Sequence, residues 1–129
     1  MDILDKVLIL FFLFQIKHMF ADYFLQTRRM LMGRGQYLHV GRAQHAAVHA
    51  AGSAIALALV GAALPIVAML IVAEWVVHFH IDWWKASYSE KKALAPDQAL
   101  FWRAAGFDQA LHQFTYIAMV WGWIASLPN

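Results

Sequence analysis

The sequence contains no cysteine, few charged residues and little net charge, and each shortage excludes a class of function. Because none of its 129 residues is cysteine, the chain forms no disulfides and offers neither a thiolate metal ligand nor a thiol nucleophile. Any metal site must therefore use nitrogen and oxygen ligands. Charged residues make up 14% of the chain and the formal net charge is +2, so we do not expect a nucleic-acid partner.

Apolar residues, in contrast, make up 62% of the chain, which is more than a soluble globule of this length normally carries. This composition predicts a single integral membrane domain over residues 1–129, with the lipid bilayer as its surroundings. The apolar runs, and the glycine and proline breakers between them, predict an all-α fold. Four transmembrane helices are expected, at about residues 3–26, 44–60, 65–88 and 98–126.

The basic residues indicate how these helices are oriented. Lysine and arginine gather in the connections at residues 27–44 and 87–97, whereas the turn at 61–65 and the tail at 126–129 carry none. Loops enriched in lysine and arginine remain in the cytoplasm. Both termini are therefore predicted to face the periplasm.

Each predicted helix carries a pair of ionisable residues four positions apart. Four residues complete about one helical turn, so both side chains of a pair lie on the same face. Ionisable groups inside a membrane are costly, and they usually serve a function. The pairs are His18 and Asp22, His45 and His49, His78 and Asp82, and Asp108 and His112.

The order of these pairs predicts that they converge. Because successive helices run in opposite directions, all four pairs should fall at one depth, near the cytoplasmic face. The motif His18-x-x-x-Asp22 also recurs 60 residues later as His78-x-x-x-Asp82. We therefore predict a four-helix bundle of two pseudo-symmetric helical hairpins, with a polar site between them.

Five histidines and three aspartates form a ligand set suited to zinc, iron or manganese. Eight donors suit two divalent ions better than one, so we predict a dinuclear site, with zinc favoured and aspartates as bridges. Glu74 is the candidate catalytic base. Three further polar residues are expected to orient ligands or transfer protons, namely Gln26, Lys85 and Gln109.

A buried polar network that relays protons is the alternative to a metal site, since a single such pair more often forms a contact between helices. Three nearby residues are expected to lie outside the site. His80 points to the opposite side of its helix, and His39 falls in a basic loop. Lys17 is offset from the polar stripe, and we expect it to snorkel or to pair with Glu74.

In combination, these residues resemble a bacterial integral-membrane family known as domain of unknown function 3307. The resemblance covers nearly the whole chain and implies a location in the bacterial inner membrane. More distantly, the chain is similar to inner-membrane proteins described as metal-dependent hydrolases, and this second similarity implies hydrolysis by analogy. The matching segments are His18-x-x-x-Asp22-Tyr-Phe-Leu-Gln26, His45 with His49, His78 with Ile81-Asp82-Trp-Trp-Lys85, and Phe101-Trp102 followed by Gly106-Phe-Asp108-Gln109-Ala-Leu-His112.

The leading functional hypothesis is a metal-dependent hydrolase that acts on a membrane-proximal substrate. Transport of a metal ion or a proton through the same residues is the main alternative, followed by a redox di-iron protein and a purely structural role. The oligomeric state stays open, with a homo-oligomer among the outcomes. A phosphorylated or lipidic substrate, such as an anionic lipid, is favoured by the neighbouring Arg28, Arg29, Arg34 and Arg42.

Overall fold

Four long helices and one short helix form the structure, a computed structural model that describes residues 1–128. No strand occurs in these residues, so the predicted all-α class is confirmed. The predicted helices correspond to the four long ones with slightly shifted ends, and α2 is a single turn inside the expected loop. The helices are α1 (Ile3–Tyr23), α2 (Arg28–Leu31), α3 (Val40–Leu59), α4 (Leu64–Lys91) and α5 (Ala99–Ala125).

Local signals in the sequence set the ends of these helices. Asp2 caps α1, because its carboxylate accepts a hydrogen bond of 2.9 Å from the backbone N–H of Asp5. Gly61 has a φ of +81°, a left-handed conformation that suits glycine, and it turns the chain from α3 into α4. Pro65 then lies in the first turn of α4, where its missing N–H costs nothing.

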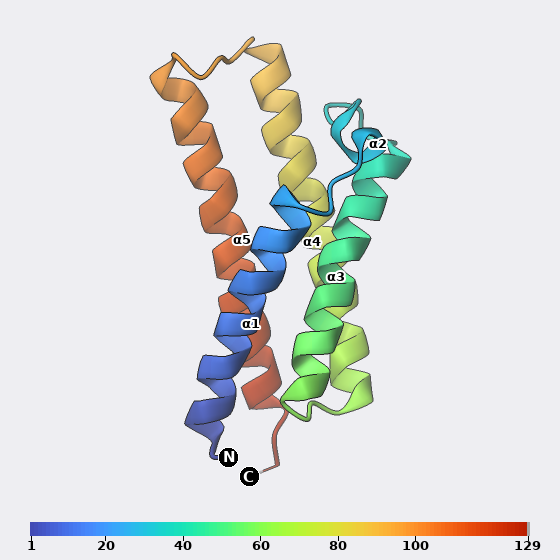
Figure 1. Ribbon diagram of the computed structural model, residues 1–129, viewed down its shortest axis with the longest axis vertical. Coiled ribbons are helices and arrows are strands. Elements are labelled where there is room, and N and C mark those ends of the chain that lie inside the picture. Colours follow the sequence, from blue (N-terminus) through green and yellow to red (C-terminus); the bar gives the residue numbers. More distant parts are fainter. Residues whose placement is uncertain (129) are drawn as a thin grey trace.

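The long helices form two antiparallel hairpins, α1 with α3 and α4 with α5 (Figure 1). The hairpins pack through α3 against α4 and, more loosely, through α1 against α5. Both termini lie at one end of the bundle together with the turn between α3 and α4. At the other end, α4 and α5 extend beyond the end of α1, and α2 packs against the start of α3. The helical bundle predicted from the repeat is thus present.

The interior of the bundle has an apolar half and a polar half. The apolar core fills the half that contains the termini, and its largest buried side chains include Phe14, Leu57 and Trp123. Further toward α2 the buried residues include most of the buried polar ones, among them His49 and His78. The polar layer therefore lies between the apolar core and the connecting loops.

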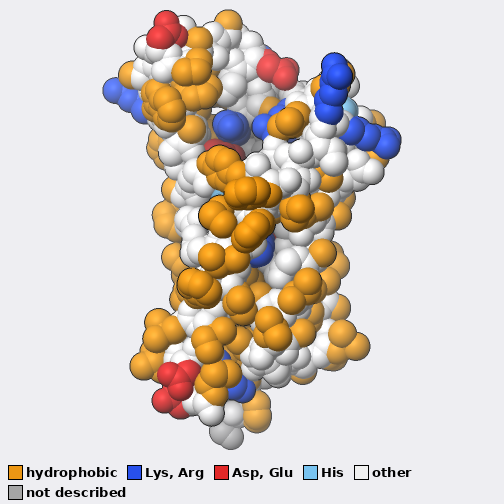
Figure 2. All heavy atoms as spheres, in the orientation of Figure 1, with side chains coloured by type: hydrophobic (Ala, Val, Ile, Leu, Met, Phe, Trp, Pro, Cys, Tyr) orange, Lys and Arg blue, Asp and Glu red, His pale blue; other side chains and the backbone are white. Residues whose placement is uncertain are grey.

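The outward faces of the long helices carry many exposed apolar side chains (Figure 2), including Leu8, Phe12, Leu59, Phe114 and Trp121. Among the helices of residues 1–128, α4 is the one that is both long and apolar enough to qualify as a membrane span. The other long helices contain more charged or weakly apolar residues, such as Lys17 in α1 and Arg42 in α3. The four predicted crossings are accordingly not confirmed by this criterion.

Candidate metal centre

The eight candidate ligands meet in one layer, and in the first hairpin they converge on Asp22. Asp22 Oδ2 lies 3.1 Å from Nε2 of His18, one turn earlier on α1. Asp22 Oδ1 lies 3.0 Å from Nε2 of His49 on α3. These two contacts link the carboxylate to a histidine of its own helix and to a histidine of the next long helix.

The second hairpin repeats this arrangement around Asp82. Asp82 Oδ2 lies 3.2 Å from Nε2 of His78, one turn earlier on α4, and Oδ1 lies 3.2 Å from Nε2 of His112 on α5. The sequence repeat is therefore also a repeat of geometry. Each hairpin forms a triad of two histidine nitrogens and one carboxylate.

Two further residues complete the cluster. His45 Nε2 lies 3.2 Å from Asp22 Oδ1 and 3.6 Å from Asp82 Oδ2, so it connects the two carboxylates. Asp108 extends the second triad, with Oδ1 at 3.5 Å from Nε2 of His112. Between the triads, the imidazole rings of His49 and His78 have centroids 3.9 Å apart.

The donor atoms are spaced closely enough to share an ion. Ligand atoms about 2.0–2.1 Å from one metal lie roughly 3 Å from each other, which matches the contacts within each triad. The same distances fit N–H···O hydrogen bonds, so the case for metal depends on how many donors converge. Three groups have donor atoms within 4.8 Å of one another, namely His18 with Asp22 and His49, His78 with Asp82 and His112, and His45 with His49 and His78.

Tyr116 supports the cluster from below, and the sequence analysis did not identify it. Its hydroxyl lies 2.7 Å from Nδ1 of His18, on the side of the ring that faces away from Asp22. Metal-binding histidines usually donate their second ring N–H to a partner of this kind, which fixes the tautomer. The signal was present in the sequence, because Tyr116 follows His112 by four residues on the same face of α5.

The polar residues predicted to assist the ligands all border the cluster. Gln109 Oε1 lies 3.0 Å from Nε2 of His18, and Gln26 Nε2 lies 3.5 Å from Nε2 of His45. Lys85 lines the cavity above the cluster. Their positions are compatible with orienting the ligands, although Lys85 contacts none of them by a hydrogen bond or an ion pair within residues 1–128.

Glu74, the candidate base, lies below the cluster instead of in the cavity. Its side chain is fully buried, and its carboxylate forms an ion pair with Lys17, which confirms the predicted pairing of Lys17. Lys17 Nζ also lies 3.3 Å from the carbonyl oxygen of His49. Glu74 therefore reaches the site only through Lys17, and it does not line the space open to a substrate.

The other two histidines lie outside the cluster, as predicted. His80 is exposed, and its Nε2 lies 3.0 Å from the hydroxyl of Tyr37. His39 is the residue that precedes the first turn of α3 and makes no side-chain capping bond there. Neither belongs to a group of donors that could share an ion.

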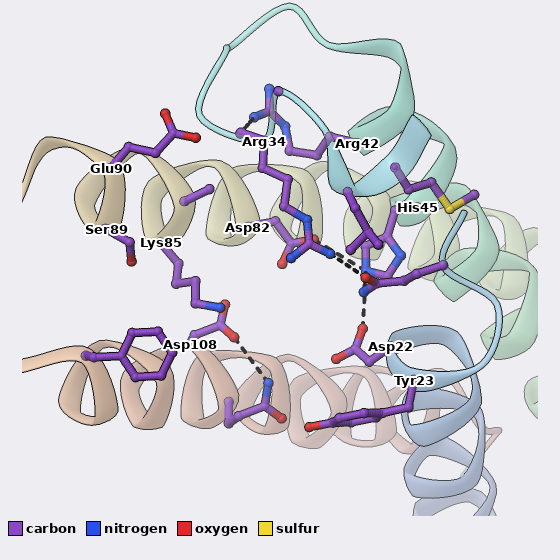
Figure 3. A pocket seen from close by; sticks show the side chains of 17 residues that line it. Asp22, Tyr23, Arg34, Arg42, His45, Asp82, Lys85, Ser89, Glu90 and Asp108 are labelled. Atoms are coloured by element: carbon purple, nitrogen blue, oxygen red, sulfur yellow. Dashed lines mark hydrogen bonds and ion pairs between the residues drawn. The ribbon is translucent and has the colours of Figure 1, made fainter. Parts of the chain in front are cut away.

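A cavity of about 460 Å³ opens above the cluster, on the side away from the apolar core (Figure 3). Three carboxylates and one imidazole of the cluster line it, from Asp22, His45, Asp82 and Asp108. Arg34 reaches into it from the segment before α3, and Lys85 enters from α4. The cluster is thus accessible from one end of the bundle and closed by apolar packing at the other.

No curated protein and no solved structure shows a significant match to the chain. A family described as protein of unknown function (DUF3307) matches residues 10–128, which include every candidate ligand. This match agrees with the resemblance drawn from the histidine and aspartate motifs. The chain therefore belongs to the DUF3307 family of proteins of unknown function.

Proposed function

We propose that the protein is a membrane metalloenzyme, a hydrolase in which the His/Asp cluster holds two divalent ions. One observation carries the proposal, the pair of equivalent triads joined by His45. In the first triad Asp22 is the shared carboxylate, and in the second it is Asp82. Zinc is favoured, with iron or manganese as alternatives, because all donors are imidazole nitrogen or carboxylate oxygen.

The charge of the cluster favours two ions. Histidines that bind a metal are neutral, so in the metal-bound cluster the three aspartates would contribute three negative charges to a largely buried layer, where uncompensated charges are strongly unfavourable. Two divalent ions bring four positive charges. The three carboxylates and one hydroxide would neutralise them, and a hydroxide is the nucleophile that hydrolysis requires.

In this proposal the residues around the ions have distinct tasks. Bound divalent ions would polarise the substrate and lower the pKa of a water molecule. Tyr116 orients His18 through Nδ1, Gln109 borders the metal-facing Nε2 of the same ring, and Lys17 contacts the backbone carbonyl oxygen of His49. Glu74 acts through Lys17 as its counter-ion, and the substrate enters by the cavity.

The surface of the bundle supports a place in the membrane. Each long helix has 20 residues or more, and at about 1.5 Å per residue each is roughly as long as the apolar part of a bilayer is thick. Exposed apolar side chains cover the outward faces, as lipid contact requires. We propose a multi-pass protein of the bacterial inner membrane with both termini in the periplasm.

Hydrolysis is favoured over transport because the cluster opens on one side. A transported ion needs access to both faces of the membrane. Below the cluster, beyond the buried Lys17–Glu74 ion pair, the side chains belong to the apolar core, which offers no ligand to an ion in transit. The cavity, in contrast, connects the cluster with the end of the bundle that carries the basic loops.

Elemental analysis of the detergent-purified protein tests the proposal. We expect about two ions per chain, a marked loss of metal in His78→Gln, and full metal content in the control His80→Gln, which changes a histidine outside the cluster. A screen of soluble and lipidic esters should then show hydrolysis that a chelator abolishes. Less than half an ion per chain under non-chelating conditions would contradict the metal site, and a coloured oxidised state would indicate a di-iron redox protein instead.

A further inference from the structure

Two cationic side chains in the cavity have N–H groups that make no hydrogen bond within residues 1–128. Arg34 donates from Nη2 to Oε1 of Gln26, which leaves its other N–H groups without a partner among residues 1–128. Lys85 forms no ion pair and no hydrogen bond in the same part of the chain. Arg42 also lines the cavity, but its guanidinium is buried and donates to the carbonyl oxygens of Arg34 and Tyr37.

Arg34 is held in place by the segment on which it lies. We call residues 32–39, between α2 and α3, the Arg34 loop. The backbone N–H of Gly35 donates to Oε1 of Glu90 at 3.2 Å, and Nε1 of Trp83 donates to the carbonyl oxygen of Gly35 at 3.2 Å. These bonds tie the loop to α4, while Arg42 ties it to α3. The loop is therefore fixed, with Arg34 directed toward Asp82 (Figure 3).

Lys85 lies on the side of α4 that carries the cluster. It follows Asp82 by three residues, so its side chain projects from the same face of the helix, closer to the mouth of the cavity. Figure 3 shows Arg34 entering from the Arg34 loop and Lys85 from α4, with Asp82 near the arginine and Asp108 near the lysine. An anion held between Arg34 and Lys85 would therefore lie directly over the proposed ions.

We propose that Arg34 and Lys85 bind the phosphoryl group of the substrate. This inference depends on the proposed hydrolase function and narrows its substrate to a phosphate ester. A guanidinium donates two parallel hydrogen bonds to a phosphate, and an ammonium adds a compact charge. A tetrahedral phosphoryl group has enough oxygens to reach both cations and the metal layer together, whereas a carboxylate has two. In the reaction, the oxygen of water bonds to phosphorus, the ester P–O bond breaks, and the leaving oxygen takes up a proton.

The mouth of the cavity fits two sources of the phosphoryl group, a lipid and a soluble ester. Tyr23 and Leu31 line it and are exposed, so an apolar chain attached to the phosphate can rest against them. A lipid phosphate and a soluble phosphate ester present the same anion to Arg34 and Lys85. The test therefore includes both.

Binding of inorganic phosphate to the metal-loaded protein in detergent, measured by calorimetry, is the first experiment. Loss of a charge-assisted hydrogen bond should weaken phosphate binding about tenfold or more in Arg34→Gln and in Lys85→Gln. The control is Arg103→Gln, which removes an exposed cation of α5 outside the cavity. Metal content measured on each sample shows whether the variant is folded. Unchanged phosphate affinity in both cavity variants with full metal content would overturn the inference.

The second experiment identifies the source of the phosphate. The protein is reconstituted in phosphatidylcholine vesicles with and without phosphatidic acid, and glycerol 3-phosphate is the soluble probe. If binding of one probe weakens in Arg34→Gln and Lys85→Gln but not in Arg103→Gln, the result supports the site. The probe that behaves in this way identifies the source of the phosphoryl group. Preference for succinate over both phosphate probes would contradict a phosphoryl site.

The two proposals fail in distinguishable ways. If phosphate binding depends on Arg34 and Lys85 but no phosphate ester is hydrolysed, the hydrolase proposal fails and the anion site remains. If phosphate esters are hydrolysed with an unchanged KM in both variants, the hydrolase proposal remains and the anion site is wrong. Binding therefore has to be measured separately from turnover.

Discussion

The buried ion pair of Lys17 and Glu74 joins α1 to α4 directly below the His/Asp cluster. Both side chains are almost completely removed from solvent, and Lys17 also packs over the ring of Tyr116, with Nζ at 4.4 Å from the ring centroid. A buried charge is tolerable only while its partner is present. Replacing one residue of the pair should therefore lower the stability of the protein more than replacing both.

Lys17→Met should destabilise the protein by about 3–5 kcal/mol, because it leaves the Glu74 carboxylate buried without a counter-ion. The double variant Lys17→Met with Glu74→Leu should recover most of this loss, since no charge remains to be compensated. Denaturant unfolding in detergent measures both effects. Equal destabilisation of the single and double variants would show that packing, and not charge, is what the pair provides.

The two aspartates at the centres of the triads give a second test at this scale. Asp22→Asn and Asp82→Asn each replace the shared carboxylate of one triad, so each should lower the metal content from about two ions to about one. The combined variant should bind almost none. Plasma emission spectrometry of the purified variants measures this directly. Complete loss of metal in either single variant would indicate one mononuclear site in place of two linked ones.

At the scale of the helices, α2 and the start of α3 approach each other closely at Gly41. A Cβ atom added to Gly41 would overlap the backbone carbonyl oxygen of Arg29, which is not a flexible side chain and cannot swing away. Gly106, in the first third of α5, has nothing within 4 Å of an added Cβ. The two glycines thus respond oppositely to the same change.

Gly41→Ala should lower the free energy of unfolding by about 1–3 kcal/mol or more, because α2 and α3 must separate to admit the methyl group. Gly106→Ala should instead stabilise the protein by about 0.5–1 kcal/mol, because alanine is the better helix former. Melting curves of the two variants under one set of detergent conditions provide the comparison. A stabilising Gly41→Ala would contradict the close packing of α2 against α3.

At the scale of the whole molecule, basic residues gather at one end of the bundle (Figure 2). Of its ten lysines and arginines, only Lys6 and Lys17 precede the connection that contains α2, and none follows Arg103 in the half of α5 that leads to the C-terminus. The two termini lie together at the opposite end (Figure 1). This asymmetry sets the orientation that we propose for the membrane.

A reporter fused after residue 129 should therefore be periplasmic. Alkaline phosphatase fused there should be active and green fluorescent protein dark, while fusions in the connection between α4 and α5 should give the reverse pattern. Carbonate washing of bacterial membranes provides the companion test, since an integral protein stays with the membrane. A fluorescent C-terminal fusion would invert the orientation, and release by carbonate would contradict membrane insertion.

Much of the fold follows from local patterns in the sequence. Apolar runs interrupted by glycine and proline specify the four long helices, because helix formation depends on neighbouring residues. The spacing of four between His18 and Asp22 places both side chains on one face of a helix, and the repeated motif places the second pair in the same way. The candidate cluster could therefore be predicted residue by residue. The short helix α2 could not, since four residues carry too little periodicity.

The sequence by itself determined the helices, the faces on which the eight donors lie and the absence of thiolate ligands, because these depend only on residue type and helical period. Only the tertiary structure decided which nitrogen meets which carboxylate oxygen, how His45 links the two triads, and that the Arg34 loop turns its arginine into the cavity. It also placed Glu74 below the cluster, with Lys17 between it and the site. These relations join residues far apart in the chain, and they follow from the packing of whole helices, which no local pattern encodes.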